Sequence, residues 1–453
     1  MHSIWAVALN TIKQALRMKI AAVFIVLLVV LLPVMGVSMT GDGTIKGRLQ
    51  TFISYGFSLT SLLLCLLTII TSVYSVTNDI KQMQIYTVIT KPIRRFQFLL
   101  GKFLGVLLLN VVLLAMFSAV IYTIVIFTPS YFKADNAEIA RLNNEFFTAR
   151  TTVKPAEEDV SKEVQKEYDK LKKDGQLPPE ILASKSANDK YMAWLTNQKK
   201  LEKRAAAVGH EIIWKFSDVR ASEPNQSLFV RFKYDVSVNP PDSQVYGRWF
   251  AGDDRQLPYD VYAFDRKDTI RTFYEIEVPG DAVAKDGYLA VGFLNVPLNN
   301  TVVIFPPGDG LELLYKTGTF NGNFFRSVLL LLCRLIFLAC LGILASTFLS
   351  FPVAILLCLV GFFTASISGF VAESFGFLGE GTGMIYSYTV RPIVMLLPQF
   401  DKFNPVGYLV PARILDWSLV AEVFGIMICI KALLLLLFAL LIFSRKEIAK
   451  ITI

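Results

Sequence analysis

Six long apolar stretches constrain the fold of this chain more than any other feature of its sequence. They cover residues 20–37, 52–76, 103–127, 327–350, 352–371 and 417–443. An α-helix rises about 1.5 Å per residue, so about 20 apolar residues cross the roughly 30 Å hydrocarbon core of a bilayer. Each stretch meets or approaches that length, and a content of 18% charged residues is low for a globular protein. The sequence therefore predicts an α-helical polytopic membrane protein with six spans.

A polar insert, residues 129–320, separates the third stretch from the fourth. It holds 26 Lys and Arg against 29 Asp and Glu, while the other residues hold 19 against 8, so the net charge of +8 comes from the membrane part. Cytoplasmic loops of membrane proteins carry an excess of Lys and Arg. With the N-terminus inside, the inner segments hold eleven such residues and the short outer segments hold five. We therefore expect an integral plasma (inner) membrane protein with both termini in the cytoplasm, residues 129–320 outside, and no nucleic-acid partner.

The periodicity of the insert changes near residue 209. In residues 129–208, apolar side chains recur at helical spacing among dense charges, as from Val160 to Leu171, and a Gly- and Pro-rich break separates two such runs. In residues 209–320, apolar and polar side chains alternate in several short runs, as from Val230 to Val238. The insert is therefore expected to be an α+β domain, in which a helical hairpin precedes a β-sandwich. A jelly roll is one candidate for that sandwich.

One stretch of the predicted sandwich combines aromatic rings with carboxylates. The candidate ligand contacts in it are Tyr246, Trp249, Phe250, Asp253, Asp254 and Tyr259. Rings beside carboxylates can form a platform for a sugar or a peptide; alternatively, the rings fill the core and the acids lie in turns. The two histidines, His2 and His210, lie far apart in the sequence, and there is no C-x-x-C pair, so we expect no metal site.

Three charged residues lie inside apolar stretches, where a charge is costly and marks a candidate functional position. Arg334 and Glu422 lie within about two helical turns of the outer ends of their stretches. They can pair, face a cavity, or extend their polar ends to the membrane surface. Lys431 lies near the middle of the last stretch, and it is a candidate for lining a dimer interface or a substrate path.

The segment between the second and third stretches, residues 78–102, carries the most informative pattern. It has an acidic start, a short amphipathic run, a basic turn around a proline, and a Gly-Lys entry into the next stretch. This order resembles the cytoplasmic loop of type-2 ATP-binding-cassette (ABC) exporter permeases, in which the short helix is a coupling helix that docks on the ATPase subunit. The residues assigned to coupling are Asp79, Met83, Tyr86, Lys91, Pro92, Arg94, Arg95 and Lys102, whereas Gln84 stands where many members have glycine.

Other segments agree with this resemblance. Residues 1–128 contain a segment similar to the family's interfacial elbow helix, followed by three spans. Residues 321–453 contain the other three spans and, at 374–416, a segment that resembles the partly embedded outer segment before the family's last span. The resemblance does not cover the insert, because most members have a short loop at that place.

The chain has no G-x-x-x-x-G-K-[ST] phosphate-binding loop, so it cannot hydrolyse ATP by that machinery. The resemblance implies an exporter permease without enzyme activity or a cofactor of its own, driven by two copies of a separate ATPase subunit that bind ATP and Mg²⁺. A second permease chain, identical or homologous, and membrane lipids are the other implied partners. The alternative is a subunit of an energised envelope or motility complex, whose external domain binds a partner or transmits force without bulk transport.

Overall fold

The chain forms two compact units. The computed structural model describes residues 2–82, 94–156, 159–178, 181, 185–219, 226–255, 260–375, 388–389, 391–392 and 396–445. One unit, the helical unit, comprises Met1–Phe147 and Thr319–Ile453, and the other, the inserted unit, comprises Thr148–Gly318. The chain therefore leaves the helical unit once and returns to it once.

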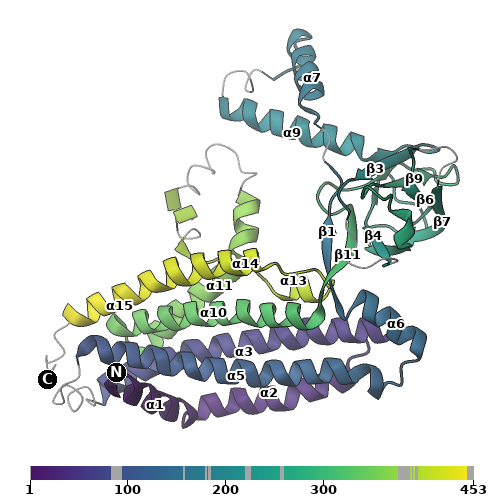
Figure 1. Cartoon of the computed structure of the whole chain (residues 1–453). Helices are drawn as coiled ribbons and strands as arrows, with labels where there is room; N and C mark the ends of the chain where they lie inside the picture. The colour runs from purple at the N-terminus through teal and green to yellow at the C-terminus, as the bar shows by residue number, and fades with distance from the viewer. Residues whose placement is uncertain are drawn as a thin grey trace. The chain divides into compact units, whose positions relative to one another are not determined.

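Six helices of the helical unit are long and apolar enough to cross a membrane, within the part of the chain that the structure describes. They are α2 (Lys19–Ser38), α3 (Ile45–Lys81), α5 (Arg95–Tyr131), α10 (Phe320–Phe348), α11 (Phe351–Phe375), and a last helix made of α14 (Trp417–Val423), the π-helical turns η2 (Phe424–Ala432) and α15 (Leu433–Arg445). Shorter helices are α1 (His2–Leu16), α6 (Asn136–Glu145) and α13 (Val406–Leu409). The predicted helical fold is confirmed, and Figure 1 shows the long helices side by side.

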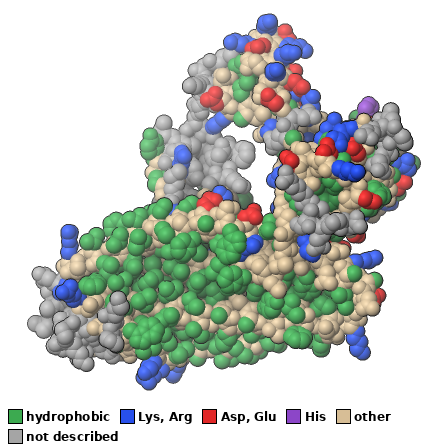
Figure 2. Space-filling model, in the orientation of Figure 1, with side chains coloured by type: hydrophobic (Ala, Val, Ile, Leu, Met, Phe, Trp, Pro, Cys, Tyr) green, Lys and Arg blue, Asp and Glu red, His purple; other side chains and the backbone are tan. Residues whose placement is uncertain are grey.

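Helices α3 and α10 form the interior of the helical unit, while α2, α11 and the last helix lie at its surface. Of the apolar window of α3, 72% is buried, against 17% of that of α2. Helices α3 and α10 approach closely at Gly342, where a Cβ atom would lie 1.9 Å from Ser72 Oγ. The surface helices expose apolar side chains such as Val26, Val360 and Phe438, and Figure 2 shows a broad hydrophobic surface on this unit. Such a large apolar surface suits contact with lipid rather than with water.

The two helices that flank the loop at residues 82–94 are longer than a bilayer requires. Helices α3 and α5 contain 37 residues each. At 1.5 Å per residue, each is about 55 Å long, whereas the hydrocarbon core is about 30 Å thick. Both helices are therefore longer than the bilayer core is thick. The C-terminal end of α3 and the N-terminal end of α5, which the loop connects, can lie outside the hydrocarbon core.

The inserted unit contains two four-stranded sheets, with strand orders β1-β11-β4-β8 and β3-β9-β6-β7. The strands are β1 (Thr148–Val153), β3 (Glu211–Phe216), β4 (Leu228–Phe232), β6 (Gln244–Asp253), β7 (Asp260–Thr269), β8 (Tyr274–Val278), β9 (Leu289–Asn295) and β11 (Leu311–Thr319). A small third sheet joins β2 (Ala205–Ala206), β10 (Val303–Ile304) and β5 (Asp235–Val236) in the order β2-β10-β5.

The eight longer strands pair in a nested order. The first strand, β1, pairs with the last, β11; then β3 pairs with β9, β4 with β8, and β6 with β7. This nesting of antiparallel pairs across two sheets is the topology of a jelly roll. Aromatic rings fill the space between the sheets: the ring centroid of Trp249 lies 4.3 Å from that of Phe232 and 4.9 Å from that of Phe293. The predicted β-sandwich is confirmed.

A helical hairpin, α7 (Ser161–Lys173) and α9 (Lys185–Lys203), lies between β1 and β3 in the chain. It has a small core of its own that includes Val164, Tyr168 and Leu195. The sequence places a single helical region at residues 129–208, whereas the structure divides that region at Thr148 and inserts β1 before the hairpin. The preceding helix α6 belongs to the helical unit because Phe146, at its end, stacks on Phe320 of α10 with ring centroids 5.7 Å apart.

Candidate functional site

A buried ionic cluster connects the helix ends on either side of the loop. Lys102 Nζ lies 2.6 Å from Asp79 Oδ2, and the two side chains are 1% and 5% exposed. Gln14 of α1 completes the cluster, because its Nε2 donates to Asp79 Oδ1 at 3.2 Å and its Oε1 accepts from Lys102 Nζ at 3.2 Å. The cluster therefore ties the end of α3 and the beginning of α5 to the N-terminal helix.

Two glycines of α5 allow α1 to approach closely enough for this cluster to form. A Cβ atom at Gly101 would lie 2.6 Å from Val7 Cβ and 2.9 Å from the Ile4 carbonyl oxygen, and one at Gly105 would lie 2.7 Å from the Ala8 carbonyl oxygen. Small residues four apart permit such backbone contact between helices in a membrane. The Gly-Lys sequence at residues 101–102 thus combines a contact position with a buried charge.

Two other predicted coupling residues are exposed at the beginning of α5. Arg94 is the N-cap residue of α5, and its backbone N–H donates to Gln97 Oε1 at 3.1 Å. Arg95 donates from Nη1 to the Ser444 carbonyl oxygen at 2.8 Å, so it contacts the end of the last helix. The predicted residues Met83, Tyr86, Lys91 and Pro92 lie outside the described residues.

A cavity of about 380 Å³ lies between the end of α3 and the turn from α10 to α11. Its walls include Tyr74, Asn78 and Lys81 from α3, and Ser346 and Ser350 from the other side. It therefore lies beside the end of α3 at which the loop begins.

The two intramembrane cations bind the same short segment, a link that the sequence did not indicate. Arg334 donates from Nη2 to the Phe400 carbonyl oxygen at 2.9 Å and from Nη1 to Ser61 Oγ at 3.1 Å. Lys431 donates from Nζ to the Leu397 carbonyl oxygen at 2.8 Å. Both cations therefore hold the backbone of residues 396–401, which we call the clamped segment.

The clamped segment also bonds to α11. The Phe400 N–H donates to the Ala365 carbonyl oxygen at 2.9 Å, and Asp401 Oδ2 accepts from the Phe370 N–H at 3.0 Å. Gly369 leaves room for this carboxylate, because a Cβ atom there would lie 2.5 Å from Asp401 Oδ2. Asp401 was not among the residues predicted from the sequence, although it lies in the outer segment that resembles the family's.

Glu422 does not join these contacts. It lies on α14 with an exposed side chain, and the guanidinium of Arg334 instead bonds to Ser61 and Phe400. The exposure of the Glu422 side chain agrees with the interpretation in which its carboxylate extends to the membrane surface.

The aromatic and acidic candidates of the jelly roll do not share one face. Along β6, Trp249 points into the core and is 2% exposed, while Tyr246 is 38% exposed and Phe250 is half-buried. Arg255 bonds to the carboxyl of Asp253, which lowers the pKa of that group to about 2. Asp254 accepts a hydrogen bond from the Tyr288 hydroxyl at 2.7 Å. Tyr259 lies outside the described residues.

These features define a membrane protein with six candidate spans and an inserted jelly-roll unit. The chain matches no protein-family model, no curated protein and no solved structure. Among the described residues, no group of three His, Cys, Asp or Glu side chains is arranged to hold a metal ion.

Proposed function

We propose that this chain is the transmembrane permease subunit of an ABC exporter, driven by a separate ATPase subunit that docks on the loop at residues 78–102. The proposal starts from the resemblance of that loop to the coupling loops of type-2 exporter permeases. The observation that supports it most strongly is the cluster of Gln14, Asp79 and Lys102, which braces both helices that enter the loop.

The cluster gives the loop a mechanical role. A docked ATPase would push or pull on the loop, and a loop on loosely packed helix ends would absorb that movement. Because Asp79 and Lys102 are buried and paired, separating α3 from α5 at this point is costly. Movement of the loop is therefore passed to α3, α5 and α1 together, as a rigid-body displacement.

The proposal assigns an orientation and a set of partners. The loop and both termini lie in the cytoplasm, and residues 129–320 lie outside the plasma (inner) membrane, as the positive-inside rule favours. Two ATPase subunits carry ATP and Mg²⁺, and a second permease chain, identical or homologous, completes the membrane part. In this arrangement, Arg334 and Lys431 keep the clamped segment against α11 while the helices move.

The test is a purification of the full chain in mild detergent, with the bound proteins identified by mass spectrometry. We expect an ABC ATPase subunit to co-purify. We also expect replacement of both Arg94 and Arg95 by alanine to lower the stimulated ATPase activity of the complex roughly tenfold, which corresponds to about 1.4 kcal/mol of activation free energy. Lys285→Ala, a change of an exposed lysine in the inserted unit, is the matched control and should leave that activity unchanged. Absence of an ATPase, or full activity of the double variant, would refute the proposal.

The second candidate is an energised envelope or motility complex that performs no bulk transport. The observation that favours it is the size of the inserted unit, a complete jelly roll with a helical hairpin, which offers a large surface for a partner protein. Reconstitution of the complex into vesicles separates the two candidates. ATP-dependent flux of a lipid, glycan or peptide supports the exporter, and ATP hydrolysis without flux supports the alternative.

A further inference from the structure

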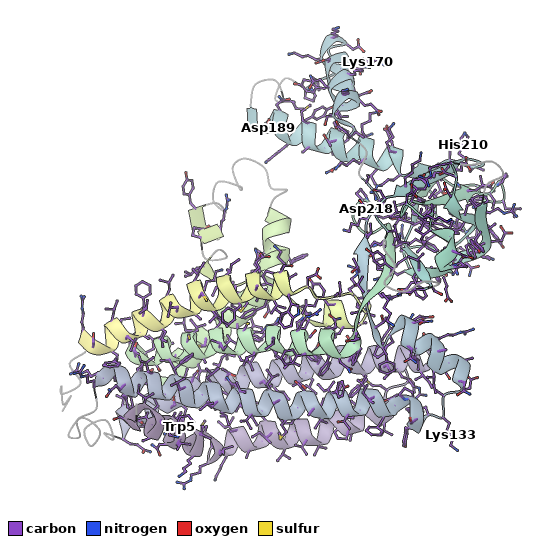
Figure 3. All side chains as sticks on the ribbon, in the orientation of Figure 1. Trp5, Lys133, Lys170, Asp189, His210 and Asp218 are labelled. Atoms are coloured by element: carbon purple, nitrogen blue, oxygen red, sulfur yellow. The ribbon has the colours of Figure 1, made fainter. Side chains whose placement is uncertain are left out.

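A cavity of about 350 Å³ opens beside strand β3 of the inserted unit. It is lined by Ile212, Ile213, Trp214 and Lys215 of β3, by Lys200, Lys203 and Arg204 at the end of α9, and by Pro155, Ala156, Val160 and Pro307. Figure 3 labels His210 and Asp218, which come just before and just after β3 in the chain.

This cavity runs along the edge of β3 rather than over one of its faces. Side chains of a strand alternate between its two faces. Here Ile212 and Trp214 pack toward the jelly-roll core, whereas Ile213 and Lys215 are exposed on the other face. A cavity that contacts all four must lie beside the backbone, where the N–H and C=O groups of the strand point.

Strand β3 is an edge strand of its sheet. Strand β3 pairs with β9 on one side, and within the described residues of its sheet no strand lies on the other side. An open edge is a template on which an extended segment of another chain can add as a strand. Backbone hydrogen bonds then supply affinity, and the side chains around the edge supply specificity.

The charges around the cavity indicate which kind of segment it would accept. Four cations line it, Lys200, Lys203, Arg204 and Lys215, and no Asp or Glu is found among its described lining residues. Lys203 pairs with Glu163 at 3.0 Å, and because the side chains are 43% and 50% exposed, this salt bridge is a weak one.

We propose that this cavity binds an extended acidic segment of a partner protein, which adds as a strand to the edge of β3. Carboxylates on one side of the segment pair with the cations at the end of α9 and with Lys215. Apolar side chains on the other side of the segment contact Ile212 and the proline-lined wall of the cavity. The proposal concerns the inserted unit alone, so it does not depend on the transport function proposed above.

The test uses the full chain in detergent and a short fluorescein-labelled peptide of alternating Glu and Val, with binding measured by fluorescence anisotropy. We expect saturable binding of this peptide. The Lys215→Glu variant should bind it roughly fivefold more weakly, because an attraction becomes a repulsion at a partly exposed site. Lys285→Glu makes the same charge change at an exposed position of the same unit away from the cavity, and it should bind like the unchanged chain.

A second peptide distinguishes strand addition from simple attraction between charges. It has the same sequence, but alternate backbone nitrogens are methylated on the edge that would face β3, so it cannot form the ladder of hydrogen bonds. Loss of binding by the methylated peptide supports the proposal. Equal binding of both peptides, or equal binding to Lys215→Glu and Lys285→Glu, overturns it. Because Lys215 is exposed, its replacement should leave the unfolding temperature unchanged, which the same samples can verify.

Discussion

The buried charges of Asp79 and Lys102 stabilise each other rather than contacting a partner protein. Lys102→Met would leave a buried carboxylate without its cation, which typically costs about 3–5 kcal/mol. In the double variant Asp79→Leu and Lys102→Met no charge stays buried, so most of that loss should be recovered. Unfolding of the detergent-solubilised chain by added denaturing detergent, followed by circular dichroism, measures both variants. Lys13→Met, at an exposed position of α1, is the control; a double variant no more stable than Lys102→Met would show that the two charges do not stabilise each other.

The same residues show what the sequence can and cannot reveal about a site. Asp79 and Lys102 could be identified from the sequence because they belong to a loop with a recognisable pattern. Arg334 and Lys431 could be identified because charged residues are rare in apolar helices. Their partners could not be predicted: Gln14 lies 65 residues from Asp79 in the chain, and Arg334 bonds to a backbone carbonyl that no side-chain pattern marks. Such contacts depend on how helices pack, which a single sequence does not specify.

At the scale of secondary-structure elements, the packing of α1 on α5 depends on the absence of a side chain at Gly101. Gly101→Ala would place a Cβ atom 2.6 Å from Val7 Cβ and 2.9 Å from a backbone oxygen of α1, so the helices must separate. Overpacking of this kind typically costs about 1–3 kcal/mol. Gly425→Ala is the matched control, because a Cβ atom there would have no neighbour within 4 Å, and alanine favours helix by up to about 1 kcal/mol. Equal unfolding free energies for the two variants would show that α1 is not held by this contact.

The elements themselves were largely predictable, and their connections were not. Apolar stretches about as long as a bilayer requires indicated the six helices, and the alternation from Val230 to Val238 indicated short strands. The nested pairing of β1 with β11 could not be predicted, because these strands are separated by the hairpin and six other long strands. Local periodicity also gave no reason to separate α6 from the hairpin, since that division depends on the stacking of Phe146 on Phe320.

At the scale of the whole molecule, the two units should be separable because the chain passes between them at one place. The inserted unit begins with β1 and ends with β11, and these strands are neighbours in one sheet. The hydroxyl oxygens of Thr151 on β1 and Thr317 on β11 lie 2.6 Å apart, so the two chain segments that connect the units run side by side. A short linker can therefore join the two ends of the helical unit. In the helical unit, Phe146 and Phe320 stack on each other, so the two ends that the linker must join are close together.

We therefore expect a chain in which a Gly-Ser linker replaces residues 149–318 to keep a folded helical unit. Its helical signal should unfold within a few degrees of that of the full chain, because no core residue of the helical unit is removed. If the proposals above hold, the shortened chain should still co-purify with the ATPase subunit and should not bind the acidic peptide. Aggregation of the shortened chain, under conditions in which the full chain is monodisperse, would mean that the helical unit depends on the inserted unit. Loss of ATPase binding by a folded shortened chain would place the docking surface outside the loop, because the deletion leaves Asp79, Arg94 and Lys102 unchanged.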